Sequence, residues 1–244
     1  MQKSKIEWTD YTINPVKGLC PMACSYCYAR RMYKRFHWDE TVRFEPEQAF
    51  VDAFNALAGS KIFVGSTMEL FGDWVKPNWL EQVMGWPKAL PNKTFIFLTK
   101  QPQNIIKYSP FPKNCWIGVS ATDMESFHKG INALAAINAK VKFVSVEPLL
   151  QSVNIAWMNP ECVNWVIIGQ QTPQNKKTQP KIEWVKEIVD ASDKSKIPVF
   201  LKNNLIPMID ELPDNCFTKK LSGDMDLRQE FPVVSPEGDK ERGE

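Results

Sequence analysis

The chain has 244 residues, of which 43% are apolar and 24% are charged, as is ordinary for a globular protein with a sizeable core. This length suits one large domain or two small ones, and a net charge of +2 is too small to indicate a polyanionic partner by itself. The charged start "MQKSKIEWTD" excludes a secretory signal, and no apolar stretch approaches the roughly 20 residues of a membrane span. We therefore expect a cytoplasmic protein with no membrane partner and with reduced thiols.

Short apolar runs recur along the chain, and each is typical of a strand buried on both faces, as in a parallel sheet. A first strand is expected within "EWTDYTIN", and six more at "KIFVGS" (Lys61), "TFIFLT" (Thr94), "CWIGVS" (Cys115), "KFVSVEP" (Lys142), "WVIIG" (Trp165) and "IPVFLK" (Ile197). Amphipathic helices are expected at "PEQAFVDAFNALAG" from Pro46 to a stop at Gly59, "DMESFHKGINALAAINAK" from Asp123 and "QPKIEWVKEIVDASDK" from Gln179.

The spacing of these segments predicts an α/β fold of six or seven successive βα units. Such units form a parallel (β/α) barrel, partial or complete, which we assign to residues 1–203. An open doubly wound sheet is the alternative, because spacing alone does not separate the two. Residues 204–244 lose the pattern and are predicted to form a C-terminal extension, partly docked and partly flexible.

Three of the six cysteines crowd into "GLCPMACSYCYARR", at Cys20, Cys24 and Cys27. A structural zinc site needs four ligands, so it would require a distant fourth such as Cys115 or Cys216. An iron–sulfur cluster with one iron left free of protein ligands is the other interpretation. The incomplete set of thiols then leaves a coordination position for a small molecule.

The motif C-x3-C-x-aromatic-C resembles the signature of the radical S-adenosylmethionine (AdoMet) superfamily. The resemblance implies that Cys20, Cys24 and Cys27 hold a [4Fe–4S] cluster whose fourth iron binds AdoMet, and that Tyr26 packs against the adenine. It implies a parallel (β/α) barrel fold. It also implies a one-electron donor such as a flavodoxin or ferredoxin, and a 5′-deoxyadenosyl radical that abstracts hydrogen from a substrate.

Nearly the whole chain also resembles, more closely, a phage and bacterial family that is radical-AdoMet-like and of unassigned function. The resemblance is carried in order by "IEWTDYTINPVKG", "CSYCYARR", "LTKQPQNI", "WIGVSAT", "VSVEPLL", "WVIIGQQ" and "FLKNN". Where that family has Gly-Gly-Glu-Ser-Gly, this chain has "GQQTP" from Gly169, so it lacks the acid, as would suit a barrel that binds AdoMet without cleaving it. The Cys-x-Tyr-Cys ending is also similar to that of the spore photoproduct lyases, a DNA-repair family.

Polar residues follow the apolar strands, and in a parallel barrel such positions face the active site. They are Ser66, Thr67, Thr99, Lys100, Ser120, Glu147, Gln170 and Lys202. The resemblance implies that the turn with Ser66 and Thr67 contacts AdoMet, and we expect Lys100, Ser120 and Glu147 to bind the cofactor as well. The alternatives are a solvated lysine at Lys100 and, for Glu147, a structural ion pair with Lys100 or Lys202.

Two basic segments, "YARRMYKR" from Tyr28 and "PQNKKTQPK" from Pro173, favour a nucleotide or nucleic-acid substrate. A solvated helix face is the alternative for the first segment, and a peptide is the second choice of substrate. A non-catalytic nucleic-acid-binding module with a metal as a folding staple is the other class of function. The resemblance also offers Cys216 as a hydrogen-atom donor, although a small buried apolar residue is the first expectation for each of Cys115, Cys162 and Cys216.

Overall fold

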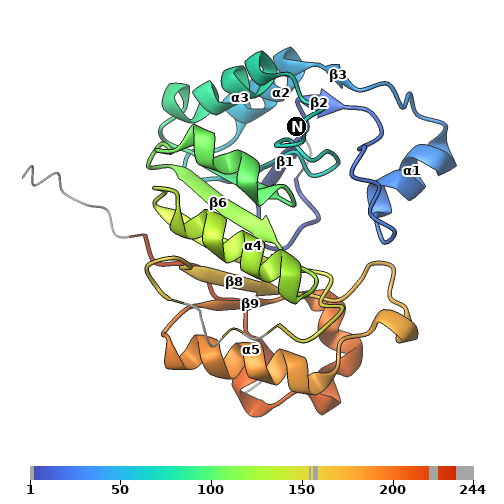
Figure 1. Ribbon diagram of the computed structural model, residues 1–244, viewed down its shortest axis with the longest axis vertical. Coiled ribbons are helices and arrows are strands. Elements are labelled where there is room, and N and C mark those ends of the chain that lie inside the picture. The colour runs from blue at the N-terminus through green and yellow to red at the C-terminus, as the bar shows by residue number, and fades with distance from the viewer. Residues whose placement is uncertain (1–2, 154, 156–158, 220–224, 235–244) are drawn as a thin grey trace, which may run out of the picture.

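Seven parallel strands form the central sheet of this computed structural model, which describes residues 3–153, 155, 159–219 and 225–234 (Figure 1). Along the sheet they follow their order in the chain: β1 (Tyr11–Ile13), β4 (Lys61–Val64), β5 (Thr94–Thr99), β6 (Cys115–Ser120), β7 (Val141–Val146), β8 (Trp165–Ile168) and β9 (Val199–Leu201). The order never reverses, so the sheet is not doubly wound. The predicted partial parallel barrel is confirmed.

Four helices follow or precede the strands and cover the outer face of the curled sheet: α2 (Pro46–Asn55), α3 (Pro77–Ala89), α4 (Met124–Ala135) and α5 (Ile182–Lys194). The short helix α1 (Tyr28–Phe36) instead projects from the edge at which the strands end, on the right of Figure 1. Four 3-10 helices complete the connections: η1 (Pro102–Tyr108), η2 (Lys176–Thr178), η3 (Asn203–Glu211) and η4 (Asp214–Cys216). Among the described residues, no helix has the length and apolar composition needed to cross a membrane.

Local sequence explains where the helices begin and end. Asp123 caps α4: its carboxylate accepts the Ser126 N–H over 2.8 Å, and the Ser126 hydroxyl accepts the Asp123 N–H over 3.2 Å. Helix α2 ends at Asn55, so the prediction that it runs to Gly59 was too long. Helix α3 was not predicted, and it contains two prolines, Pro77 and Pro87. Pro77 lies in the first turn, where its missing N–H has no helical partner to lose.

Both faces of the sheet are buried, which explains why the strands are apolar at almost every position. Alternate residues such as Ile62, Val64 and Phe97 face the helices. The others face the hollow of the half-barrel, where they pack in an aromatic floor made of Trp8, Phe63, Ile96, Trp116, Val141, Phe143, Trp165, Ile167 and Phe200. The side chains of this aromatic floor do not reach the carboxyl ends of the strands, where polar residues line the hollow instead.

The chain after Asn203 packs on β9 at the edge of the sheet. The Leu201 N–H donates to the Arg228 carbonyl over 2.8 Å, and β10 (Phe217–Lys219) pairs with β11 (Met225–Leu227) as an antiparallel ribbon. Residues 235–244, predicted as a flexible end, lie outside the described residues. The division of the chain into a barrel at 1–203 and an extension at 204–244 stays a prediction.

Candidate functional site

The cysteine loop joins β2 (Val16–Lys17) to α1 and is held against the segment before β3 (Arg43–Phe44). It begins at Gly18, whose φ is 111° and where a Cβ would lie 2.5 Å from the Thr41 carbonyl oxygen, so only glycine fits. Two turns then close. The Ala23 N–H donates to the Cys20 carbonyl over 3.4 Å, and the Cys27 N–H donates to the Cys24 carbonyl over 3.1 Å. These turns gather the three cysteines at the start of α1.

The three thiols are free and half-buried, and they line one small, partly open pocket together with Arg30 and Thr67. Arg30 holds the loop from the helix side, because its Nη2 donates to the Cys20 carbonyl over 2.6 Å. Across the described residues, no three His, Cys, Asp or Glu side chains converge on a point where one metal ion would bind. Ligands of a [4Fe–4S] cluster need not converge, since each cysteine binds a different iron. Three thiols from one loop are a donor set that such a cluster could use.

The surroundings of the loop bear on the charge of its thiols. Burial raises the pKa of the Cys20 thiol, and the Glu69 N–H, which lies 3.5 Å from Cys20 Sγ, offsets part of that rise. Cys27 is the N-cap residue of α1, directly before its first turn. A coordinated metal ion would overcome the effect of burial on the Cys20 thiol, because a metal holds cysteine sulfur as the thiolate.

The other cysteines lie away from this loop. Cys115 opens β6 at the opposite edge of the sheet and is fully buried, and burial raises its pKa to about 12. Cys216 is also fully buried, next to Asn215, whose side chain donates to Asp190 near the end of α5 over 2.9 Å. Burial raises the pKa of Cys216 to about 11. The structure thus brings neither Cys115 nor Cys216 to the three clustered thiols.

Ser66 and Thr67 follow β4 and share one partner, Asn14, which follows the neighbouring strand β1. The Asn14 Oδ1 accepts from the Ser66 hydroxyl over 3.2 Å, and from both the N–H and the hydroxyl of Thr67 over 3.1 Å. The Tyr28 hydroxyl of α1 donates to the Ser66 carbonyl over 3.1 Å. These bonds fix the turn after β4 against the cysteine loop, and Thr67 lines the pocket of the thiols.

Lys100, after β5, points across the end of β6. Its ammonium donates to the Ser120 hydroxyl over 2.5 Å and lies 5.4 Å from the centre of the Tyr26 ring. Burial lowers the pKa of Lys100, and the nearby sulfur and carboxylate groups only partly restore it. Burial also raises the pKa of the Tyr26 hydroxyl, next to Cys24. Lys100 is therefore not the solvated lysine of the alternative interpretation.

Glu147, after β7, lies in an ion pair with Lys202, after β9. The Lys202 ammonium is 2.5 Å from Glu147 Oε1 and 3.7 Å from Glu7 Oε2, and the Asn204 amide donates to the same Glu147 oxygen over 3.4 Å. Gln170, after β8, exchanges hydrogen bonds with Asn204. The structural ion pair that the sequence left open for Glu147 is thus present.

Glu69 is the most deeply buried carboxylate of this edge, and the sequence analysis did not single it out. It is 8% exposed and accepts three hydrogen bonds: from the Phe71 N–H over 3.0 Å, the Thr99 hydroxyl over 2.7 Å and the Lys100 N–H over 2.6 Å. Burial raises the pKa of Glu69, and the three donors offset part of that rise. Its place in the apolar run "TMELF" is the signal that could have identified it.

Asn14 and Asn204 were missed as well. Both follow strands, so the rule used for the other strand ends would have found them had it been applied to "YTIN" and to the second asparagine of "FLKNN". Together with Lys100, Ser120 and Glu147 they line a polar end above the aromatic floor, beside the cysteine loop.

Residues 3–209 match the family described as protein of unknown function DUF5131. The chain belongs to this family. The description of DUF5131 names no activity and no phage origin, so the predicted phage connection stays a prediction. No curated protein sequence matches the chain.

Solved structures of spore photoproduct lyase share the fold of this DUF5131 member. The lyase in complex with dinucleoside spore photoproduct is 12% identical, with a TM-score of 0.51, over 94% of this chain and 71% of the lyase chain. A double mutant of the lyase with bound AdoMet and dinucleoside spore photoproduct is 12% identical, with a TM-score of 0.50, over 93% of this chain and 70% of that one. At this identity the likeness establishes a common fold.

Proposed function

We propose that this DUF5131 member is a radical AdoMet enzyme that acts on a nucleotide or nucleic acid. One observation carries the proposal: three free thiols from one loop line a single pocket at the polar end of a half-barrel. The fold shared with a lyase that has been solved with bound AdoMet supports it.

Cys20, Cys24 and Cys27 would hold a [4Fe–4S] cluster, since they are the free thiols of that pocket. When bound and reduced, the cluster supplies one electron that splits the C5′–S bond of AdoMet into methionine and a 5′-deoxyadenosyl radical, which takes a hydrogen atom from the substrate. The chain's own contribution is to hold the thiols, to limit access of water and to orient AdoMet.

The residues that would orient AdoMet surround the loop. Tyr26 offers a half-buried ring for the adenine, with Lys100 on one of its sides. The Lys100 ammonium has three donors and gives one to Ser120, so others remain for a carboxylate. Ser66 and Thr67 offer backbone and hydroxyl groups whose positions Asn14 fixes. Glu147, paired with Lys202, offers a carboxylate at the same edge of the sheet.

Reductive cleavage of AdoMet tests the proposal. Protein reconstituted anaerobically with iron and sulfide should release 5′-deoxyadenosine when dithionite, as the one-electron donor, and AdoMet are added. Chromatography of the quenched reaction measures it, with protein kept free of iron as the control. A protein that takes up iron and AdoMet but releases no 5′-deoxyadenosine would contradict an enzymatic role and favour a barrel that binds AdoMet without cleaving it.

A further inference from the structure

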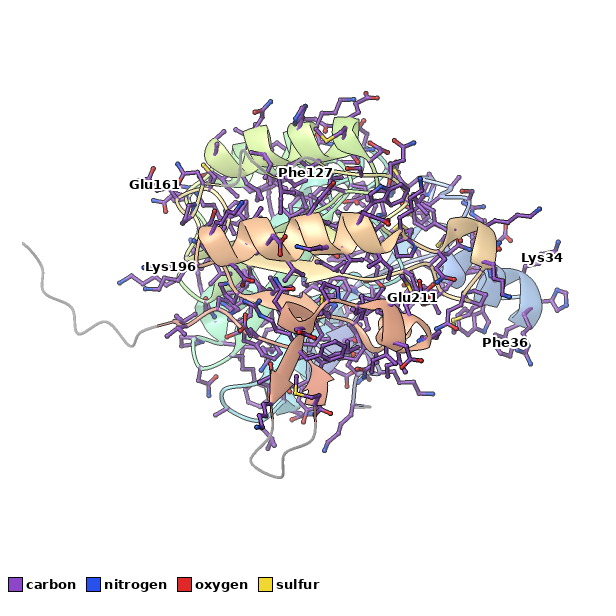
Figure 2. The ribbon with its side chains drawn as sticks, turned by 90° about the horizontal axis from the view of Figure 1, so that it is seen from below. Lys34, Phe36, Phe127, Glu161, Lys196 and Glu211 are labelled. Atoms are coloured by element: carbon purple, nitrogen blue, oxygen red, sulfur yellow. The ribbon has the colours of Figure 1, made fainter. Side chains whose placement is uncertain are left out.

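Helix α1 carries an exposed surface that the proposed chemistry does not use. We call it the α1 surface and define it as Arg31, Lys34, Arg35, Phe36 and Trp38. All five side chains are exposed, with Phe36 at 51% and Trp38 at 44%. The opposite side of α1, at Ala29 and Tyr33, is buried against the protein. Figure 2 shows Lys34 and Phe36 at the far end of the molecule, pointing away from it.

The aromatic part of this surface is built by the end of the helix. His37 adopts the left-handed conformation, with φ of 50°, and the Trp38 N–H donates to the Tyr33 carbonyl over 3.2 Å. This turn places the Trp38 ring against Phe36, with centroids 5.4 Å apart and an angle of 23° between the planes. The Tyr33 ring packs against the Trp38 ring in a T-shaped arrangement, with the two centroids 5.3 Å apart. Two large rings are thus held parallel and left open to solvent.

The charge of this surface has one sign. Four cations lie between Arg30 and Arg35, and no acid occurs from Gly18 to Trp38. The Arg35 guanidinium lies 5.4 Å from the centre of the Phe36 ring, so a cation and an aromatic ring lie next to each other on this surface. The first acid of the segment, Asp39, pairs with Arg43 over 3.2 Å and does not neutralise the helix.

A second basic segment projects from the same edge of the sheet. The loop that contains η2 carries the exposed residues Lys176 and Lys177, and both views show it on the side of the molecule where α1 projects (Figures 1 and 2). The edge with the cysteine loop is therefore flanked by cations at two places. Glu161 and Lys196, labelled in Figure 2, lie at the opposite end.

We propose that the α1 surface binds single-stranded nucleic acid, with Arg31, Lys34 and Arg35 at phosphates and the Phe36–Trp38 pair stacked on a base. Alternating cations and open rings suit this polymer, because every base has a face that stacks and every nucleotide has a phosphate. A duplex keeps its bases stacked on each other and offers no free face. The inference rests on the proposed function only in naming its substrate class, since binding is measured without AdoMet cleavage.

Fluorescence anisotropy with a labelled oligothymidylate tests this inference on the reconstituted protein. The triple variant Arg31→Gln, Lys34→Gln, Arg35→Gln should bind at least about tenfold more weakly, and its slope of log K against log salt should be smaller by about 2. Trp38→Ala should weaken binding about tenfold through lost stacking, with little change in that slope.

The matched control neutralises three lysines at the opposite edge, in Lys88→Gln, Lys194→Gln, Lys196→Gln. It changes the net charge equally and should bind as the unchanged protein does, while iron content and circular dichroism verify that each variant is folded. Equal binding by the two triple variants would overturn the inference. So would equally tight binding of a duplex or of an oligoglutamate peptide. A failure of the proposed function would be seen in different measurements, as a lack of bound iron or of released 5′-deoxyadenosine.

Discussion

Replacing Cys24 with alanine should abolish cluster formation and leave the fold intact. The Cys24 thiol is free and half-buried in a surface loop, and the two core clusters that hold the sheet do not include it. After anaerobic reconstitution, the unchanged protein should hold about four irons per chain, and the variant should lose them together with the charge-transfer absorption and the release of 5′-deoxyadenosine. Iron and sulfide analysis measures this, with circular dichroism for the fold.

Cys162→Ala is the matched control for Cys24→Ala. Cys162 is also half-buried, but it lies before β8 at the opposite edge of the sheet, so its replacement should leave the iron content unchanged. A Cys24→Ala protein that unfolds would instead favour the metal as a folding staple of a binding module. Full retention of iron by that variant would remove Cys24 from the set of ligands.

Replacing Lys202 with methionine should lower the free energy of unfolding by about 3–5 kcal/mol, because the change leaves two half-buried carboxylates facing each other. The Lys202 side chain is 13% exposed and those of Glu147 and Glu7 are 22% exposed, so little water is available to replace the ammonium. Urea denaturation measures the loss. The control pair, Lys129 with Glu125 on α4, is mostly exposed. Lys129→Met should therefore lower the free energy of unfolding by less than about 0.5 kcal/mol.

The pH dependence of this effect has a defined sign. Burial lowers the pKa of Lys202, but the Glu147 and Glu7 carboxylates raise it more, so the net pKa lies above the ordinary 10.5. Stabilisation by the lysine is therefore complete below pH 10.5 and is lost as the pH rises through its higher folded value. Adding Glu147→Gln to Lys202→Met should recover part of the loss. A Lys202→Met protein as stable as the parent at neutral pH would contradict a strong ion pair.

The parallel half-barrel could be predicted from the sequence because its strands are buried on both faces. Runs such as "WVIIG" are apolar at every position, and in the structure Val166 and Ile168 face the helices while Trp165 and Ile167 face the floor. The regular change from an apolar strand to a polar residue at its end also predicted most of the polar residues at this edge of the sheet. Ser120 is the last residue of its strand, and Lys100, Glu147 and Lys202 each follow one. The fold brings them into contact with one another or with a neighbouring residue of the site.

Other features depend on contacts between distant parts of the chain. The hydrogen bonds of Asn14 to the turn after β4 join residues more than fifty positions apart, and those of Glu69 reach across to the end of β5. Helix α3 was not predicted: Pro77 suits its first turn, but Pro87 lies inside the helix, where proline is disfavoured and only the surrounding packing can retain it. Local patterns identify strands and caps, whereas partners such as Glu7 for Lys202 come together only in the folded half-barrel.

Mössbauer and electron paramagnetic resonance spectra of the anaerobically reconstituted protein test most directly whether one iron is left for AdoMet. We predict a [4Fe–4S] cluster in which one iron differs from the other three, and a spectrum of the reduced cluster that changes when AdoMet is added. Four equivalent irons that do not respond to AdoMet, or a tightly held zinc in place of iron, would contradict the account.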